Sequence, residues 1–369
     1  MFRMTMLPAQ QGDSLWVEYG PDDSPFRILI DAGTPPTERA VRERILDLPE
    51  DRRRIELVIV THIDTDHIGG VLKLLSAPPE GLDVGDVWFN ERRHLEQPQL
   101  SHLGAIDGEI LGAQLDALGW TWNAAFGTGL VVVGDGPDPP PSIDLAGEMR
   151  LTLLSPGPTE TQTLKTKWLA ELDENELDPS SPDYAEKLSE KMHRKGVVAP
   201  STLGDEDLES VGELASHLFT EDDSPANGSS IAVLAEQDGR SCLLTGDAVP
   251  SAMIPSIRRL LAARHETSLR VDAVKLPHHG SQNNLNTEFL DLVLSPRWLF
   301  STNGMQHHHP DAPAVARVLV ANEGRHPVLG FSYPKGVNPK ADRWDATSLK
   351  DEFQYTTEFA DVGGLTVDV

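Results

Sequence analysis

The sequence predicts a layered α/β fold with two sheets. Strand-like and helix-like segments alternate in both halves of the 369-residue chain, and buried strands end in histidine or aspartate at three separate places. A chain of this length exceeds the usual size of a single domain, so it forms either one large domain with an insertion or two domains. We expect one domain over residues 1–369, with a helical insertion at residues 157–226.

The first half of the chain changes repeatedly between strand and helix patterns. "FRMTMLP" and "SLWVEYG" alternate apolar and polar residues as strands do, whereas "TERAVRERILDL" has helical spacing. The apolar run "IELVIVT" is typical of a buried strand. The expected elements are strands at 2–8, 14–20 and 26–33, a helix at 37–48, a strand at 55–61, a helix at 68–77, a strand at 84–90, helix within 92–118, a proline-rich loop at 130–145 and a strand at 148–156.

Residues 157–226 differ in character from the rest of the chain. Amphipathic, charged stretches at 164–177, 183–196 and 205–219 are separated by links that contain proline and serine. This pattern favours helices, which either form a solvated cover or act as a lid over a site. Regular alternation then resumes, with expected strands at 229–236, 241–247, 271–277 and 297–302, helices at 254–266 and 286–294, and a loop that runs into a helix at 307–322.

The composition is that of a globular protein, with 39% hydrophobic and 24% charged residues. No apolar run is long enough to cross a bilayer and no basic-then-apolar leader opens the sequence, so we expect a cytoplasmic protein without membrane contact. The single cysteine, Cys242, excludes a scaffold of internal disulfides. The formal net charge of −27 argues against wholesale coating of nucleic acid. Small or locally held anionic substrates, or a nucleic-acid end, remain as partners if metal ions supply positive charge.

The stretch "THIDTDHIGG" holds the densest group of metal-binding side chains. His62, Asp64, Asp66 and His67 follow directly on the buried strand "IELVIV". A continuing strand would send these side chains to opposite faces, so they converge only if the strand ends at Thr61 and the chain loops into a helix. Neighbouring carboxylates repel each other unless a cation lies between them. The alternative is that these are ordinary polar loop residues.

Two further candidates follow later buried strands. Asp247 comes after "SCLLTG" and His278 comes after "VDAVKLP". Three strand ends that supply histidine and aspartate together are the expected geometry of a metal site at the rim of a sheet. Other polar residues nearby receive ordinary interpretations: Lys275 as a surface charge if its strand alternation points it outward, Asp13 and Asp31 as loop-stabilising residues, and Asn283 and Asn284 as loop polar residues.

The order of "HIDTDH", "TGD" and "LPHHGS" resembles the metallo-β-lactamase superfamily. The resemblance implies an αββα sandwich with a hydrolytic site for one or two metal ions. It assigns His62 and Asp64 to the first metal, Asp66, His67 and His278 to the second, and Asp247 to a bridge between the two. The segments "MLPAQQGDSLWVEY", "ILIDAG", "NGSSIAVL", "VKLPHHGS" and "STNGMQHHHP" are similar in order to the hydrolase domain of ComEC-type competence proteins and to phosphorylcholine esterase, over most of residues 1–325 outside the insertion.

The sequence departs from the superfamily pattern at the first metal. Asp64 stands where histidine is common, and Asn227 occupies the position of a mid-chain histidine. An asparagine carbonyl oxygen is a weaker ligand than imidazole, which leaves open whether the first position is filled. Oxygen ligands move the preference from zinc toward manganese or iron. We therefore expect two divalent ions, zinc or manganese, with iron as a further candidate.

These features predict a metal-dependent hydrolase that uses a metal-bound hydroxide on a phosphodiester or related ester. Asp66 and His309 are the expected catalytic residues. His309, in the segment "HHHP", either donates a hydrogen bond or proton to the substrate or belongs to a solvated loop. His279 either orients its neighbour His278 or fills the turn.

Two other functions stay open at this point. One is a binding or signalling module that holds a metal without catalysis, which the missing mid-chain histidine favours. The other is β-lactam hydrolysis, which the lack of a secretion signal weakens.

Overall fold

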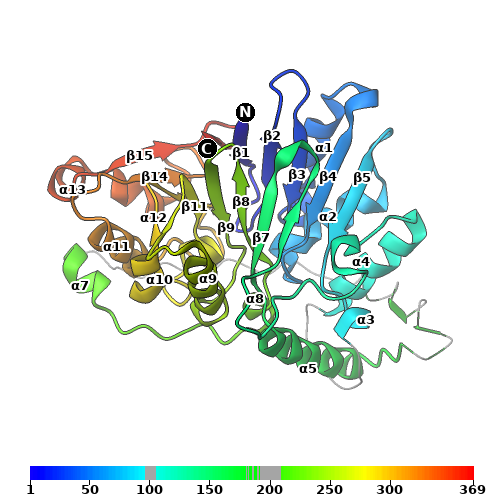
Figure 1. Cartoon of the computed structure of the whole chain (residues 1–369). Helices are drawn as coiled ribbons and strands as arrows, with labels where there is room; N and C mark the ends of the chain where they lie inside the picture. Colours follow the sequence, from blue (N-terminus) through cyan, green and yellow to red (C-terminus); the bar gives the residue numbers. More distant parts are fainter. Residues whose placement is uncertain (96–104, 180, 182, 185–186, 189–190, 192–208) are drawn as a thin grey trace.

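Two mixed sheets pack face to face, and helices cover both outer faces, in the computed structural model of the chain (Figure 1). The structure describes residues 1–95, 105–179, 181, 183–184, 187–188, 191 and 209–369. The layer order is helix, sheet, sheet, helix. The predicted αββα sandwich is therefore confirmed.

The first sheet has six strands in the order β16-β1-β2-β3-β4-β5. Strands β3, β4 and β5 run parallel, whereas β16, β1, β2 and β3 pair antiparallel with one another. Helices on its outer face come from the first half of the chain and from the start of the expected insertion. The bounds are β1 Phe2–Met6, β2 Leu15–Tyr19, β3 Phe26–Ile30, β4 Arg54–Ile59, β5 Asp83–Trp88 and β16 Leu365–Asp368, with α1 Glu38–Leu46, α2 Thr65–Ser76, α3 Arg92–Leu95, α4 Ala105–Leu118 and α5 Pro158–Glu174.

The second sheet has eight strands in the order β15-β14-β13-β11-β9-β8-β7-β6. Strands β9, β11, β13, β14 and β15 run parallel to one another, whereas β6, β7, β8 and β9 pair antiparallel in that order. The bounds are β6 Ser142–Asp144, β7 Arg150–Ser155, β8 Ala232–Gln237, β9 Arg240–Leu244, β11 Ala273–Lys275, β13 Arg297–Phe300, β14 Val328–Phe331 and β15 Thr356–Phe359, with α7 Val211–Ala215, α8 Pro225–Gly228, α9 Pro250–Arg264, α10 Thr287–Leu292, α11 Ala312–Ala321, α12 Pro339–Asp342 and α13 Thr347–Phe353. The short strands β10 Leu269–Arg270 and β12 Val293–Leu294 pair separately, so the end of the helix expected at 286–294 is a strand.

Strand β4 shows why an unbroken apolar run was needed in the sequence. Leu57 and Ile59 belong to the core between the two sheets, whereas Val58 belongs to the core beneath the helices α1 and α2. Both faces of the strand are therefore buried, as a central parallel strand requires. Because parallel strands end at the same edge, the loops after β4, β9, β11 and β13 meet at one rim of the sandwich.

The expected insertion begins with a well-packed helix. Trp168 of α5 is fully buried among the residues of α4, and its indole Nε1 donates a hydrogen bond to Glu109 Oε1 at 3.1 Å. Most of the helix expected at 183–196, part of that at 205–219 and part of the helix expected within 92–118 lie outside the described residues. The division into one domain with an insertion, and the lid alternative, stay predictions.

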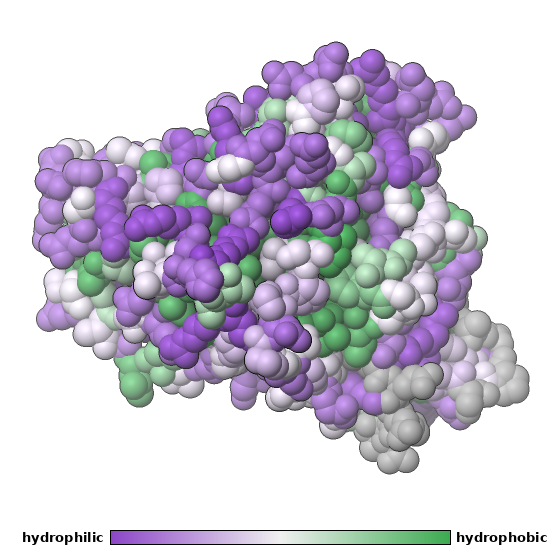
Figure 2. Space-filling view, viewed as in Figure 1, coloured by the Kyte–Doolittle hydropathy of each residue, from purple (hydrophilic) through white to green (hydrophobic). Residues whose placement is uncertain are grey.

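The face of the molecule in Figure 2 is mostly hydrophilic, in keeping with the 24% charged residues. Among the described residues, the large apolar side chains that are most exposed, Leu218 and Val362, lie far apart in the sequence. Within the same part of the chain, none of the helices combines the length and apolarity that crossing a membrane requires.

Gly70 lets helix α2 approach the loop after β3. A Cβ atom at this position would lie 2.0 Å from the carbonyl oxygen of Ala32. We expect Gly70→Ala to lower the free energy of unfolding by about 1–3 kcal/mol, because either the helix or the loop must shift. Chemical denaturation of the variant measures this loss. Gly212→Ala is the matched control, since a Cβ atom at Gly212 in α7 meets nothing within 4 Å; equal stability of the two variants would contradict the expectation.

Candidate metal centre

The loops at the rim position each predicted ligand. Strand β4 ends at Ile59 and α2 begins at Thr65, so His62 lies on the connecting loop and His67 lies in the first helical turn. Asp247 lies on the loop after β9. His278 and His279 follow β11 in a tight turn, with left-handed backbone φ angles of 46° and 57°. Two consecutive non-glycine residues in this region are unusual, and they bring adjacent rings toward the same centre.

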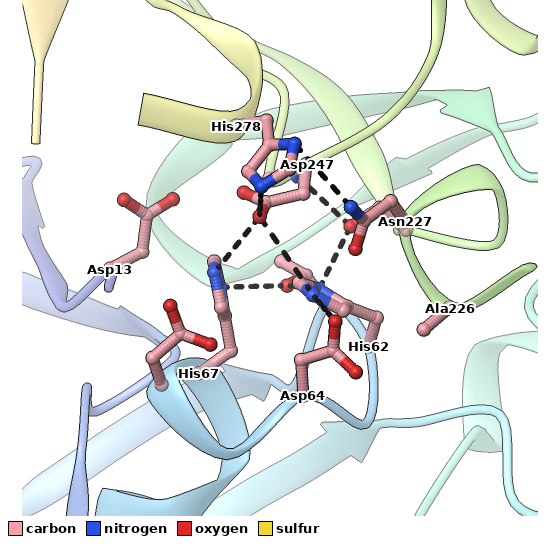
Figure 3. Close-up of polar contacts among 12 residues, drawn as sticks. Asp13, His62, Asp64, His67, Ala226, Asn227, Asp247 and His278 are labelled. Carbon is pink, nitrogen blue, oxygen red and sulfur yellow. Dashed lines mark hydrogen bonds and ion pairs between the residues drawn. The ribbon is translucent and has the colours of Figure 1, made fainter. Parts of the chain in front are cut away.

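Four imidazole rings surround one carboxylate oxygen. The distances from Asp247 Oδ2 to the Nε2 atoms are 3.3 Å for His67, 3.5 Å for His279, 3.8 Å for His278 and 3.9 Å for His62. Figure 3 shows the side chains of His62, His67 and His278 converging on Asp247, from the segment around residues 62–67 and from two later loops. Asp247 itself is buried.

The other ring nitrogen of each histidine has a polar neighbour of its own. The Nδ1 atom lies 2.8 Å from Asp31 Oδ2 in His67, 3.3 Å from Asp13 Oδ1 in His279, 2.9 Å from Asn284 Oδ1 in His278 and 3.0 Å from Ser230 Oγ in His62. Metal-binding histidines are commonly held in this way, because a partner at one nitrogen directs the other toward the metal. The arrangement therefore presents four Nε2 atoms as ligands.

Several buried polar atoms at this centre have no hydrogen-bond partner among the described residues. They include His62 Nε2, Asn227 Oδ1 and Asp247 Oδ1. Unpaired buried acceptors are costly, so their clustering calls for a ligand. Ligand atoms of Asp13, His67, Asp247 and His279 also lie within 4.8 Å of one another. Nitrogen and oxygen donors in this arrangement fit divalent zinc, manganese or iron.

The protonation of the centre shows how much positive charge it requires. Burial opposes the charged form of His278, yet Asp247 and Asp222 raise its pKa to about 9. Burial likewise opposes charge on His67, and Asp247 and Asp31 nevertheless hold its pKa well above the ordinary value. Partial burial and the neighbouring carboxylate of Asp66 raise the pKa of Asp64 to about 6. In the absence of a cation, protons thus balance the carboxylates, and a bound metal would take over this role.

The remaining predicted residues lie around the same centre. Asp64 Oδ2 is 3.7 Å from His62 Nε2, and Asp66 Oδ2 is 3.8 Å from His279 Nε2. The ring of His309 lies 5.2 Å, centroid to centroid, from the ring of His278. The Asp64 side chain is 41% exposed and marks the open side of the centre.

Asn227 is the remaining candidate ligand. Its Nδ2 lies 3.4 Å from His278 Nδ1. The structure thus brings together every residue that the sequence proposed for the site.

The interpretation of Lys275 as a surface charge and of Asn284 as an ordinary loop residue is wrong, because both side chains are fully buried. Lys275 forms an ion pair with Asp13 and lies 3.9 Å from Asp247 Oδ1, because β11 is an inner strand of the second sheet. Asn284 holds His278. Asp13 does not merely stabilise a loop, since it contacts His279. A lysine inside an apolar strand was the available signal, because a buried lysine needs a carboxylate partner.

The family comparison agrees with this geometry. Residues 9–164 match the sequence model of the metallo-beta-lactamase superfamily. The fold is the metallo-β-lactamase fold. The matched model describes the superfamily and does not single out the ComEC-type and phosphorylcholine esterase subgroup within it. A search of curated proteins found no match.

Solved structures match the whole chain at low identity. YhfI from Bacillus subtilis has 10% identity and a TM-score of 0.39, with both chains covered completely. Zinc-bound PqqB from Methylobacterium extorquens has 12% identity and a TM-score of 0.41, again with complete coverage of both chains. A long-form RNase Z from yeast has 12% identity and a TM-score of 0.35, and the match covers all of this chain and 41% of that one.

Proposed function

We propose that the protein is a metal-dependent hydrolase of phosphodiesters or related esters. The observation that supports this most strongly is the convergence of four imidazole Nε2 atoms on the Asp247 carboxylate, each ring having a polar neighbour at its other nitrogen. Divalent cations, when bound, activate water and stabilise negative charge that develops on oxygen. The chain's own residues then have to bind the ester and handle its protons.

Local charge decides which substrates the site accepts. The protein has a formal net charge of −27, so an anionic ester is repelled over most of the surface. Among the candidate ligands alone, the three carboxylates of Asp64, Asp66 and Asp247 would be outweighed by two divalent cations, which leaves about one positive charge. The carboxylates of Asp31 and Asp222 lie behind the histidines, at their Nδ1 atoms. A phosphate group, as a small molecule or at a nucleic-acid end, suits that local field.

His309 is the residue proposed to exchange a proton with the substrate or the leaving group. Its Nδ1 lies 3.3 Å from Asp311 Oδ1, which orients the ring beside His278. Burial lowers the pKa of His309 below its ordinary value, despite the opposing effect of Asp311. The lowered pKa favours the neutral imidazole, which can accept a proton.

Hydrolysis of bis-p-nitrophenyl phosphate and of short DNA, with manganese or zinc added to metal-stripped protein, tests the proposal. We expect turnover that requires the added metal, is lost in His62→Ala and is unchanged in His326→Asn, which alters an exposed histidine in a left-handed turn. Turnover without metal, or none with either ion, would contradict the proposal. Hydrolysis of nitrocefin in place of the phosphate esters would instead identify a β-lactam hydrolase.

A further inference from the structure

The paired histidines after β11 contact different groups of side chains. His279 Nε2 lies 3.4 Å from His67 Nε2 and 3.8 Å from Asp66 Oδ2. It also lies 3.5 Å from the shared oxygen, Asp247 Oδ2. These four residues, which we call the helix group because two of them open α2, supply two imidazoles and two carboxylates.

His278 lies with the other candidate ligands. Its Nδ1 is 3.4 Å from Asn227 Nδ2, and its Nε2 is 3.8 Å from Asp247 Oδ2. His62 Nε2 is 3.7 Å from Asp64 Oδ2 on the same loop. We call His62, Asp64, Asn227 and His278 the loop group. Figure 3 shows Asn227 and His62 on the opposite side of Asp247 from Asp13, the residue that holds His279.

Asp222 fixes the two unusual members of the loop group. Its Oδ2 accepts a hydrogen bond from Asn227 Nδ2 at 2.7 Å and lies 3.2 Å from His278 Nδ1. Asn284 strengthens this arrangement, because its Nδ2 donates to Asp222 Oδ2 at 3.2 Å and its Oδ1 lies 2.9 Å from His278 Nδ1. With its amide nitrogen held by Asp222, Asn227 presents its carbonyl oxygen elsewhere.

Buried atoms of the loop group are left without partners. Asn227 Oδ1 and His62 Nε2 are both buried and have no hydrogen-bond partner among the residues that the structure describes, and the same holds for Asp247 Oδ1. A divalent cation bound by Asn227 Oδ1 and His62 Nε2 would give both atoms a partner, next to Asp247 Oδ2, which lies 3.9 Å from His62 Nε2. In the loop group, Asn227 stands where the family resemblance implies a histidine. His278 is the neighbouring imidazole that could supply the missing nitrogen ligand.

We propose that His278 and His279 bind different cations. His278 and the other members of the loop group bind one divalent ion, and His279 and the other members of the helix group bind a second. Asp247 is shared by both ions. This inference rests on the metal centre of the proposed function, but it does not depend on the reaction. It differs from the assignment that the family resemblance implied, in which His278 binds the same ion as His67.

Metal stoichiometry in paired variants tests this division. Each histidine is replaced by asparagine, whose amide retains a donor near the Nδ1 position and leaves nothing at Nε2. Each protein is stripped with chelator, reloaded with manganese or zinc, freed of excess ion and analysed for metal by mass spectrometry. The wild type and the control His326→Asn are expected to retain about two ions per chain.

The two pairings of His278 give opposite expectations. His62→Asn with His278→Asn removes ligands from one position, so about one ion should remain; His67→Asn with His278→Asn damages both positions, so about none should remain. The opposite pattern is expected for His279→Asn. Combined with His67→Asn it should leave about one ion, and combined with His62→Asn it should leave about none. The inference is overturned if the double variant of His67 and His278 keeps an ion while the double variant of His62 and His278 loses both ions. It is also overturned if the wild type holds a single ion.

A milder variant covers the case in which a double substitution does not fold. Asn227→Ala should weaken binding of the remaining ion roughly 10-fold or more in the His67→Asn background and leave it unchanged in the His62→Asn background, measured by titration calorimetry. The opposite dependence on background overturns the division. Because the readout is metal bound, a protein that shows the expected stoichiometry but hydrolyses no ester would keep this inference and refute the proposed function.

Discussion

Replacing Asp247 by alanine is expected to remove tightly bound metal and to reduce bis-p-nitrophenyl phosphate hydrolysis on the order of 10³-fold. One oxygen of this carboxylate lies within 3.9 Å of the Nε2 atoms of all four histidines, so its loss affects both groups of ligands. Metal analysis after chelation and reloading, together with initial rates, measures both effects.

A matched aspartate serves as the control for this substitution. Asp361 is exposed, outside the site and near the end of the chain. Asp361→Ala should therefore leave metal content and rate unchanged. If Asp247→Ala retained two ions and a rate near that of the wild type, Asp247 could not be the carboxylate that the centre shares.

Lys275→Met is expected to cost about 3–5 kcal/mol of the free energy of unfolding. Methionine keeps most of the apolar side chain but leaves the Asp13 carboxylate buried without its cationic partner. Burial opposes ionisation of Asp13, and Lys275 with His279 holds its pKa below the ordinary value, so the pair depends on the lysine charge. Urea denaturation of metal-free protein measures the loss.

A second variant separates lost charge from lost packing. Adding Asp13→Asn to Lys275→Met removes the unpaired carboxylate, so the double variant should regain much of the stability that the single variant loses. Should the single variant unfold at the same urea concentration as the wild type, or should the double variant be the less stable of the two, the ion pair would not have the structural role assigned to it.

The layered fold could be predicted because its signals are local. Alternation of apolar residues indicated strands such as β1 and β2, and the unbroken run in β4 indicated burial on both faces. The cluster from His62 to His67 could be predicted for a similar reason, because a strand that ends before a helix has to gather these side chains at its end. Short β12 was missed, since its pairing with β10 depends on a distant part of the chain.

The supporting residues of the site could not be predicted, because their roles arise from contacts between distant segments. Asn284 is six residues from His278, but its bond to Asp222 joins segments 62 residues apart. Lys275 of β11 pairs with Asp13 of the loop between β1 and β2. The role of His279 depends on the left-handed backbone of the turn, which no residue pattern in "LPHHGS" specifies. A sequence shows which side chains are available for a site, whereas long-range packing decides which of them make contact.

The most direct test of the metal centre is a crystal structure of the metal-loaded protein, with anomalous scattering recorded at the manganese or zinc edge. We expect anomalous peaks at about 2.0–2.3 Å from the Asp247 carboxylate, and at the same distance from Nε2 atoms of the surrounding histidines. Fully loaded crystals with no peak beside Asp247, or with peaks bound only elsewhere on the acidic surface, would contradict it.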